Sequence, residues 1–318
     1  MKNLIYILIM IPLLSLAQSD FERAKSYFEK EDFSKAKPLF QKYLKTHPNH
    51  EKTREYLGDI AGYTEDWDAA INYFEGLLEE HKTSANFNFK YGGALGMKAL
   101  SVNRLRALTY VTDIKKSFEK AAKLDPNHIE VRWALVEFYI QLPRIIGGSE
   151  RKAIAYAKEL GYISEVDGHL ANGYIAEYSE RPKDAETFYK KAIEVGGSPH
   201  TYEKLSSLYE NSRQPKKAIE TSVESLKIHE RNQLNYQIGK IAAQYNVKAE
   251  IGILCLQKYI ENHSVKDGVP KDWAYYRLAQ IYKNQSQKES ALLWINKALI
   301  SRSNFKEAIK EKELILKL

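Results

Sequence analysis

The sequence lacks the residues from which a protein builds covalent cross-links. Cysteine occurs once, as Cys255, so no disulfide can form within the chain. Cys255 lies in an apolar run at residues 253–256, which is typical of a buried structural thiol and not of a reactive one. The fold must therefore rest on side-chain packing alone.

Long hydrophobic runs are also missing from most of the chain. After the first 17 residues, no segment approaches the ~20 apolar residues that a membrane-spanning helix needs. The N-terminus has a positive start at Lys2, an apolar run from Leu4 to Leu16 and a small residue at Ala17. This pattern predicts a secretory signal peptide at residues 1–17 and export to the periplasm or cell envelope. The alternative is that the same run is retained as a membrane anchor.

Charge of one sign is not concentrated anywhere in the chain. The formal net charge is +7, but Lys and Arg are mixed with Glu throughout and form no basic block. This distribution does not indicate a nucleic-acid partner and is typical of solvated helix surfaces. Because 44% of the residues are hydrophobic and 28% are charged, we expect a chain that folds and has a soluble exterior.

The common motifs of catalysis and metal binding are missing as well. The chain contains no His-Glu-x-x-His sequence, no Gly-x-Ser-x-Gly elbow, no phosphate-binding loop and no cysteine pair. His47 and His50 come closest to a cluster, but they fall in a predicted turn. We therefore predict no catalytic, metal or cofactor site and a protein that is not an enzyme. A hydrolase with clustered carboxylates in a deep pocket is the alternative.

What the sequence does contain is a repeat. Ala36 and Phe40 recur as Ala70 and Phe74, 34 residues later. Each unit pairs a first helix that carries a small residue, such as Gly58, with a second helix that carries an alanine and an aromatic residue. The small residue lets the two helices approach closely, and the aromatic side chain fills the space beside it.

Eight such units, of varying regularity, account for nearly all of residues 18–318. With motifs such as YLGDIAGY, FEKAAKLDPNH and RLAQIY…ALLWINKAL, the chain resembles exported bacterial tetratricopeptide repeat proteins. The resemblance implies an all-α fold, a right-handed α-solenoid of stacked antiparallel helix pairs. An amphipathic stretch from Phe305 to Leu318 is predicted to be the C-terminal capping helix.

Two segments depart from the regular period. About ten extra residues lie around 98–116, where helical periodicity continues without Pro or Gly, so we expect longer helices there. The connection at residues 141–149 is longer than a tight turn and contains Pro143, Gly147 and Gly148. It is either a functional contact or a tolerated insertion. The extended helices are a candidate surface for self-association.

The resemblance also implies that the first helices line a concave groove that binds a partner. Residues three before and one after each small residue should face this groove. The candidates are Phe21, Lys25, Glu55, Asp59, Phe89, Trp133, Glu137, Tyr174, Tyr236, Lys240, Tyr276 and Gln280. Aromatics beside carboxylates and lysines suit a partner peptide or helix. We therefore predict a non-catalytic protein-interaction scaffold of the bacterial cell envelope. The alternative is a module that stacks cell-wall glycan on the same aromatic side chains.

Overall fold

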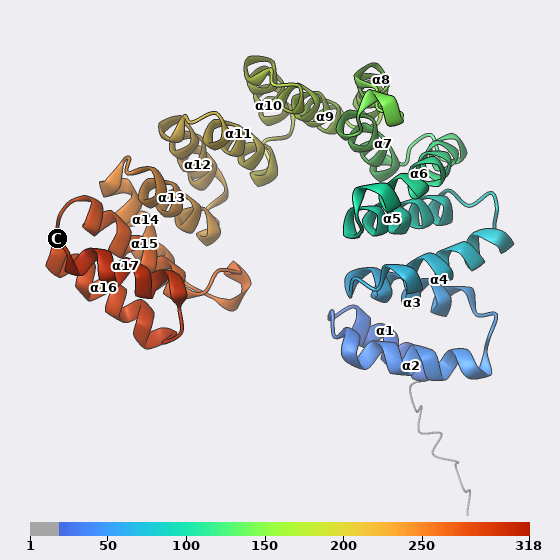
Figure 1. The fold of residues 1–318 in the computed structure, drawn as a ribbon, viewed down its shortest axis with the longest axis horizontal. Coiled ribbons are helices and arrows are strands. Elements are labelled where there is room, and N and C mark those ends of the chain that lie inside the picture. Colours follow the sequence, from blue (N-terminus) through green and yellow to red (C-terminus); the bar gives the residue numbers. More distant parts are fainter. Residues whose placement is uncertain (1–18) are drawn as a thin grey trace, which may run out of the picture. The chain divides into compact units, whose positions relative to one another are not determined.

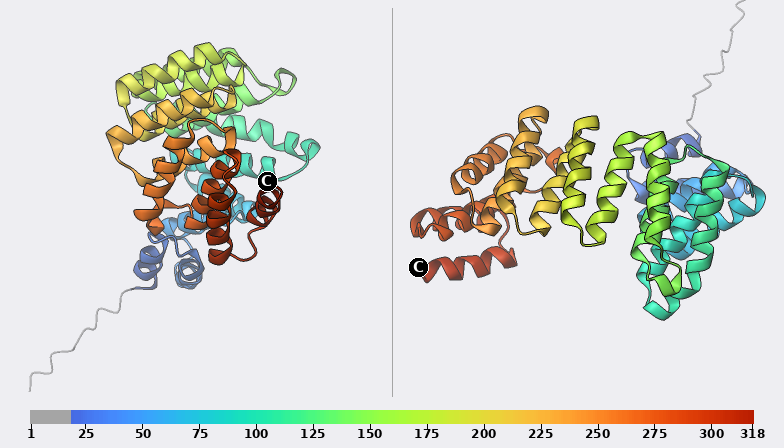
Figure 2. Two further views of the ribbon diagram at one scale, coloured as in Figure 1. Left: turned by 90° about the vertical axis from the view of Figure 1, so that its left-hand side faces the viewer. Right: turned by 90° about the horizontal axis from the view of Figure 1, so that it is seen from above.

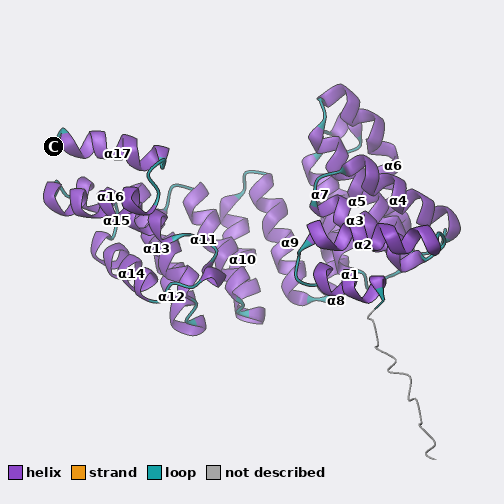
Figure 3. Ribbon diagram, turned by 90° about the horizontal axis from the view of Figure 1, so that it is seen from below, coloured by secondary structure: helices purple, strands orange, loops and turns teal. Residues whose placement is uncertain are grey.

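The computed structural model describes residues 19–318, and the regular structure of this part of the chain is helical throughout (Figures 1 and 3). It contains seventeen α-helices and two short 3₁₀ helices, with no strand between residues 19 and 318. The predicted signal peptide at residues 1–17 lies outside the described residues. The predicted all-α fold is confirmed.

The chain divides into two compact units, with the boundary between Leu135 and Val136. Unit 1 contains α1 (Asp20–Phe28), α2 (Phe33–Thr46), α3 (Glu51–Tyr63), α4 (Trp67–Glu80), α5 (Ala85–Ser101), α6 (Arg104–Leu124) and the first half of α7 (Ile129–Gln141). Unit 2 contains the rest of α7, then α8 (Glu150–Ile163), α9 (Glu165–Tyr178), α10 (Pro182–Gly196), α11 (Pro199–Asn211), α12 (Pro215–His229), α13 (Asn232–Tyr245), α14 (Ala249–Glu261), α15 (Lys271–Asn284), α16 (Lys288–Ser301) and α17 (Lys306–Leu316).

Within each unit, helices that are neighbours in sequence are neighbours in space (Figure 2). Closely packed pairs include α1 with α2, α3 with α4 and α5 with α6 in unit 1, and α8 with α9, α9 with α10, α11 with α12, α13 with α14 and α15 with α16 in unit 2. Each of these pairs is joined by a short connection, which makes the two helices antiparallel. The predicted stack of antiparallel helix pairs is confirmed, and α17 packs on the last pair.

In several pairs, the small residue of the first helix lies against a large residue of the second. A Cβ atom on Gly58 would be 2.7 Å from the ring of Phe74, and one on Gly173 would be 2.4 Å from the ring of Tyr189. Because real Cβ atoms do not approach so closely, these positions need glycine. The packing role that the sequence analysis gave to these residues is confirmed.

The helices α5 and α6 are 17 and 21 residues long, whereas the other helices have 9 to 15 residues. The extra residues are therefore helical and do not form a loop. In the connection between α7 and α8, a 3₁₀ helix at Arg144–Ile146 ends at Gly147, whose φ is +108°. Ser149 then caps α8 by accepting a hydrogen bond from the backbone N–H of Lys152. This connection has a defined backbone conformation.

Candidate protein-binding surfaces

The first helices of unit 1 carry a buried ionic cluster. The Nζ of Lys90, on α5, is 2.7 Å from Glu55 Oε1 and 2.7 Å from both carboxylate oxygens of Asp59, and both acids are on α3. Glu55 also accepts hydrogen bonds from Lys52 Nζ at 2.7 Å and from Asn86 Nδ2 at 3.0 Å. The cluster therefore joins two successive first helices, α3 and α5, through charge-assisted hydrogen bonds.

The two carboxylates of this cluster respond differently to the same surroundings. Burial works against the charge of Glu55, but hydrogen bonds from Lys52, Lys90 and Asn86 outweigh it and lower the pKa of its carboxyl to about 2. For Asp59, burial is the larger effect and raises the pKa, although Lys90 acts in the opposite direction. Hydrogen bonds thus stabilise the charged form of Glu55 in the folded protein, whereas burial destabilises the charged form of Asp59.

A second cluster lies on the first helices of unit 2. Gln141 Nε2, at the end of α7, donates a hydrogen bond of 2.7 Å to the hydroxyl of Tyr174 on α9. The Tyr178 hydroxyl donates a hydrogen bond of 3.3 Å to the backbone carbonyl of Gln141. Two tyrosine rings are therefore fixed at the end of α7, and Tyr178 remains exposed.

Glu137 lies one turn before Gln141 on the same helix. Its side chain is exposed, yet the surrounding protein removes part of its water and raises the pKa of the carboxyl, with Lys204 of α11 acting in the opposite direction. Its charge also helps to raise the pKa of the Tyr174 hydroxyl, after burial as the main cause. Glu137 forms no hydrogen bond or ion pair with any residue between 19 and 318. It is an accessible and only partly hydrated anion.

The structure thus brings together two sets of the predicted groove residues, Glu55 with Asp59 and Glu137 with Tyr174. Sequence reasoning missed their partners Lys90, Lys204, Gln141 and Tyr178. Lys90 and Lys204 both stand two residues before the small residue of their helix, a position that the sequence analysis did not consider. That position was the signal that could have identified both.

Most of the other predicted groove residues contribute to packing. Phe21 packs its ring against Phe40, with centroids 5.8 Å apart, and Phe89 packs against Phe118 at 6.0 Å. Tyr236 and Tyr276 are buried, and they contact the rings of Tyr259 and Phe305. Lys25 forms an ion pair with Glu29, and Gln280 donates a hydrogen bond to the Tyr276 hydroxyl. Trp133 is partly buried and Lys240 is partly exposed. The buried tyrosine rings offer little area for a partner or for a sugar.

Two further hydrogen bonds link successive first helices of unit 2. Asn211 of α11 donates to Glu177 of α9 at 2.9 Å, and Gln237 of α13 donates to Glu210 of α11 at 3.1 Å. Such hydrogen bonds fix one repeat against the next. These two hydrogen bonds connect α9, α11 and α13, which belong to the same unit as Glu137.

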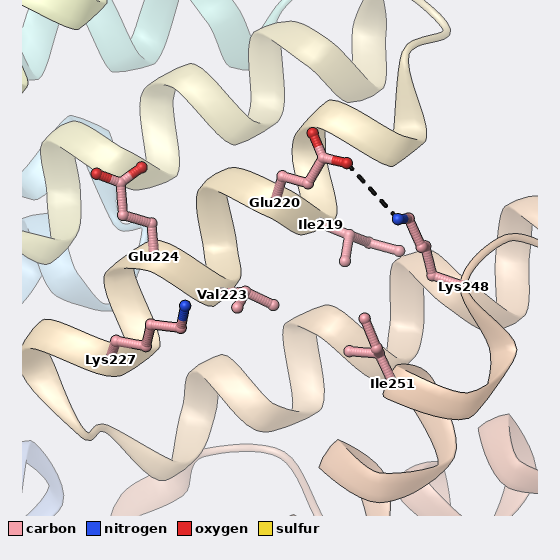
Figure 4. A pocket seen from close by; sticks show the side chains of 7 residues that line it. All are labelled: Ile219, Glu220, Val223, Glu224, Lys227, Lys248 and Ile251. Carbon is pink, nitrogen blue, oxygen red and sulfur yellow. Dashed lines mark ion pairs between the residues drawn. The ribbon is translucent and has the colours of Figure 1, made fainter.

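A separate surface pocket of 340 Å³ lies between α12 and α14 (Figure 4). Ile219, Val223 and Ile251 supply its apolar walls. At its edge, the carboxylate of Glu220 is 3.7 Å from Lys248 Nζ. Glu224 accepts a hydrogen bond from the Tyr202 hydroxyl at 3.5 Å. The two carboxylates of this pocket are thus engaged in ordinary contacts between neighbouring helices.

Within residues 19–318, no group of three or more His, Cys, Asp or Glu side chains is arranged to hold a metal ion. A search of the same residues also found no helix that is both long enough and apolar enough to span a membrane.

Two segments of the chain match a known family. The tetratricopeptide repeat family matches residues 18–50, which contain α1 and α2, and residues 274–310, which contain α16 and most of α15. Four helix pairs between these matches have a small residue packed against a large one, at Gly58, Gly92, Gly173 and Gly239. The chain thus contains tetratricopeptide repeats at residues 18–50 and 274–310. Tetratricopeptide repeats generally serve as non-catalytic scaffolds for binding other proteins.

Several solved structures of tetratricopeptide repeat proteins are similar to this one. A protein from Parabacteroides merdae is 14% identical, with 93% of this chain and 97% of that chain covered and a TM-score of 0.48. YrrB, described as having an unusual peptide-binding site, is 18% identical, with coverage of 62% and 97% and a TM-score of 0.43. TTC0263 from Thermus thermophilus is 13% identical, with coverage of 70% and 97% and a TM-score of 0.42. No curated protein matches the sequence.

Proposed function

We propose that this protein is an exported, non-catalytic scaffold of the bacterial cell envelope that binds a partner peptide or helix on the first helices of unit 2. The observation that carries the proposal is Glu137, an exposed carboxylate without a partner among the described residues, beside the fixed rings of Tyr174 and Tyr178. The apolar N-terminal run at residues 1–17 supports export.

The chemistry of this cluster suits a basic side chain of the partner. An anion that has already lost part of its water gains more from an ion pair than a fully hydrated one, because less solvent remains to be displaced. A Lys or Arg beside Glu137 would also lie close to tyrosine rings, whose faces attract cations. Because hydrogen bonds to Gln141 hold both tyrosines, little ordering cost accompanies binding.

The first test is crosslinking and affinity purification of Gln18–Leu318 from its native envelope, with mass spectrometry of the bound material. We expect a reproducible protein partner. Recovery of wall glycan without protein would contradict the scaffold and favour the glycan-binding alternative.

Variants then test whether Glu137 and Tyr178 form the binding surface. E137Q and Y178A should lower recovery of the partner about tenfold or more, because each removes a contact at the centre of the surface. The matched control is E194Q, which removes an exposed carboxylate from the second helix of its pair, α10. If all three variants bind as the unmodified chain does, the partner binds elsewhere.

A further inference from the structure

A group of exposed apolar side chains lies at the end of the long helical hairpin formed by α5 and α6. The exposed fraction is 77% for Leu100 and 81% for Leu105, and 45% for both Met97 and Leu108. The helices are joined at residues 102–103, so Leu100 and Leu105 are equally far from the turn, as are Met97 and Leu108. We call residues 97–108 the hairpin tip. Four large apolar side chains in one short segment are an unusual exposure for a soluble surface.

The hairpin tip extends past the helix that covers α5. Lys98 Nζ forms an ion pair of 2.6 Å with Asp68, which is the second residue of α4. Since α4 begins at Trp67, the residues of α5 after Lys98 have no further turn of α4 to pack against. The extra length of α5 and α6 therefore serves to carry the tip outward, and not to enlarge the contact with α4.

The charge of the hairpin tip is of one sign. No acidic residue occurs from Met97 to Thr112. Arg104 and Arg106 are exposed and form no ion pair with any residue that the structure describes. Both stand in the first turn of α6, where the helix dipole makes a positive charge unfavourable. The sequence thus keeps two arginines where helix stability alone would favour acids.

We propose that the hairpin tip docks on an anionic membrane surface, with its leucines among the lipid headgroups and its arginines on the phosphates. Met97 and Leu108 lie between five and six residues from the middle of the turn, which is about 8 Å along a helix. This depth matches the ~5–10 Å to which interfacial apolar groups enter a bilayer. A second copy of the chain is a poorer occupant, because contact between two tips would bring four arginines together.

The test is flotation of Gln18–Leu318, which contains every residue of the described structure, with vesicles. We expect binding to phosphatidylcholine vesicles that contain phosphatidylglycerol, and much weaker binding to phosphatidylcholine alone. R104Q/R106Q should reduce binding to the anionic vesicles roughly 30-fold, the combined effect of two basic residues near such a surface. L100S/L105S should reduce it at least about tenfold, because the leucines no longer gain from leaving water. Equal binding to both kinds of vesicle would overturn the charge argument.

The matched control is I300S, because Ile300 is similarly exposed but belongs to α16 of unit 2. Its binding should not change. Insertion is measured separately with an environment-sensitive fluorophore attached to S101C, whose emission should shift to the blue on anionic vesicles. The emission of the same label on S286C should not shift. Unchanged binding by both tip variants, or no shift at S101C, would overturn the proposal. So would capture of an acidic protein by the tip without vesicle binding.

Discussion

Asp59 in unit 1 and Glu137 in unit 2 occupy the same place in their repeats, directly after Gly58 of α3 and Val136 of α7, but their surroundings differ. Lys90 of the next first helix, α5, contacts Asp59 and Glu55. The corresponding residue of α9, two before Gly173, is the buried Ala171. One position in the following repeat thus decides whether an acid becomes part of the fold or remains available to a partner.

The largest effect that this comparison predicts is for loss of Lys90. K90M should lower the free energy of unfolding of unit 1 by about 3 kcal/mol, because Asp59 loses its ion-pair partner and Glu55 keeps only Lys52. Chemical denaturation measures the change. The control is K240M, since Lys240 forms no ion pair among residues 19–318 and should change stability by less than about 0.5 kcal/mol. Equal effects of the two variants would show that the cluster contributes nothing to the fold.

Lowering the pH should destabilise the cluster, because Glu55 becomes protonated. The pKa of Glu55 falls from 4.5 to about 2 on folding, so its contribution is present above pH 4.5 and is lost as the pH falls toward 2. A shift of this size corresponds to roughly 3 kcal/mol. E55Q should remove this part of the pH dependence when unfolding is measured from pH 6 down to about pH 2.

The contribution of Asp59 to stability should depend on pH in the direction opposite to that of Glu55. Because folding raises its pKa, its charge destabilises the folded state at neutral pH, and this cost disappears as the carboxyl takes up a proton. D59N should therefore cost less stability than E55Q at pH 7. If D59N is the more damaging, Lys90 binds mainly to Asp59 and the assignment of roles within the cluster is reversed.

Two adjacent glycines of α5 differ in their contacts, because Gly92 packs against α6 and Gly93 has open space beside it. A Cβ on Gly92 would lie 2.9 Å from the ring of Phe118, whereas one on Gly93 would meet nothing within 4 Å. G92A should therefore destabilise unit 1 by about 1–3 kcal/mol, and G93A should stabilise it by up to about 1 kcal/mol through helix propensity. Thermal unfolding of the two variants gives the comparison, and a stable G92A would contradict the packing role of the glycine.

The sequence was sufficient for the fold because one local rule, a small residue facing a large one, repeats through the chain. It holds at Gly58 with Phe74 and at Gly92 with Phe118, whereas Ser206 of α11 instead faces Ser222, with the two hydroxyls 3.0 Å apart. The connection between α14 and α15 was not predicted. It contains a 3₁₀ helix, Val265–Asp267, held by Asn232, and this hydrogen bond joins residues 35 positions apart.

The binding surface was harder to predict, because the two groups of predicted groove positions differ in exposure. Tyr174 and Tyr236 were both assigned to the groove, yet Tyr236 is buried against Tyr259 while Tyr174 is only partly buried. Tyr259 lies on α14, the second helix of the same pair, so the exposure of a groove position depends on the residue that the paired helix places over it.

The smallest expected effect on stability is also the most informative for function. E137Q should change the free energy of unfolding by less than about 0.5 kcal/mol, because Glu137 is exposed and no described residue pairs with it. Since folding raises its pKa, any change should be a slight gain in stability. The same variant should still lose its partner in the affinity measurement. A clear loss of stability would mean that Glu137, like Glu55, serves the fold, and the contrast between the two units would disappear.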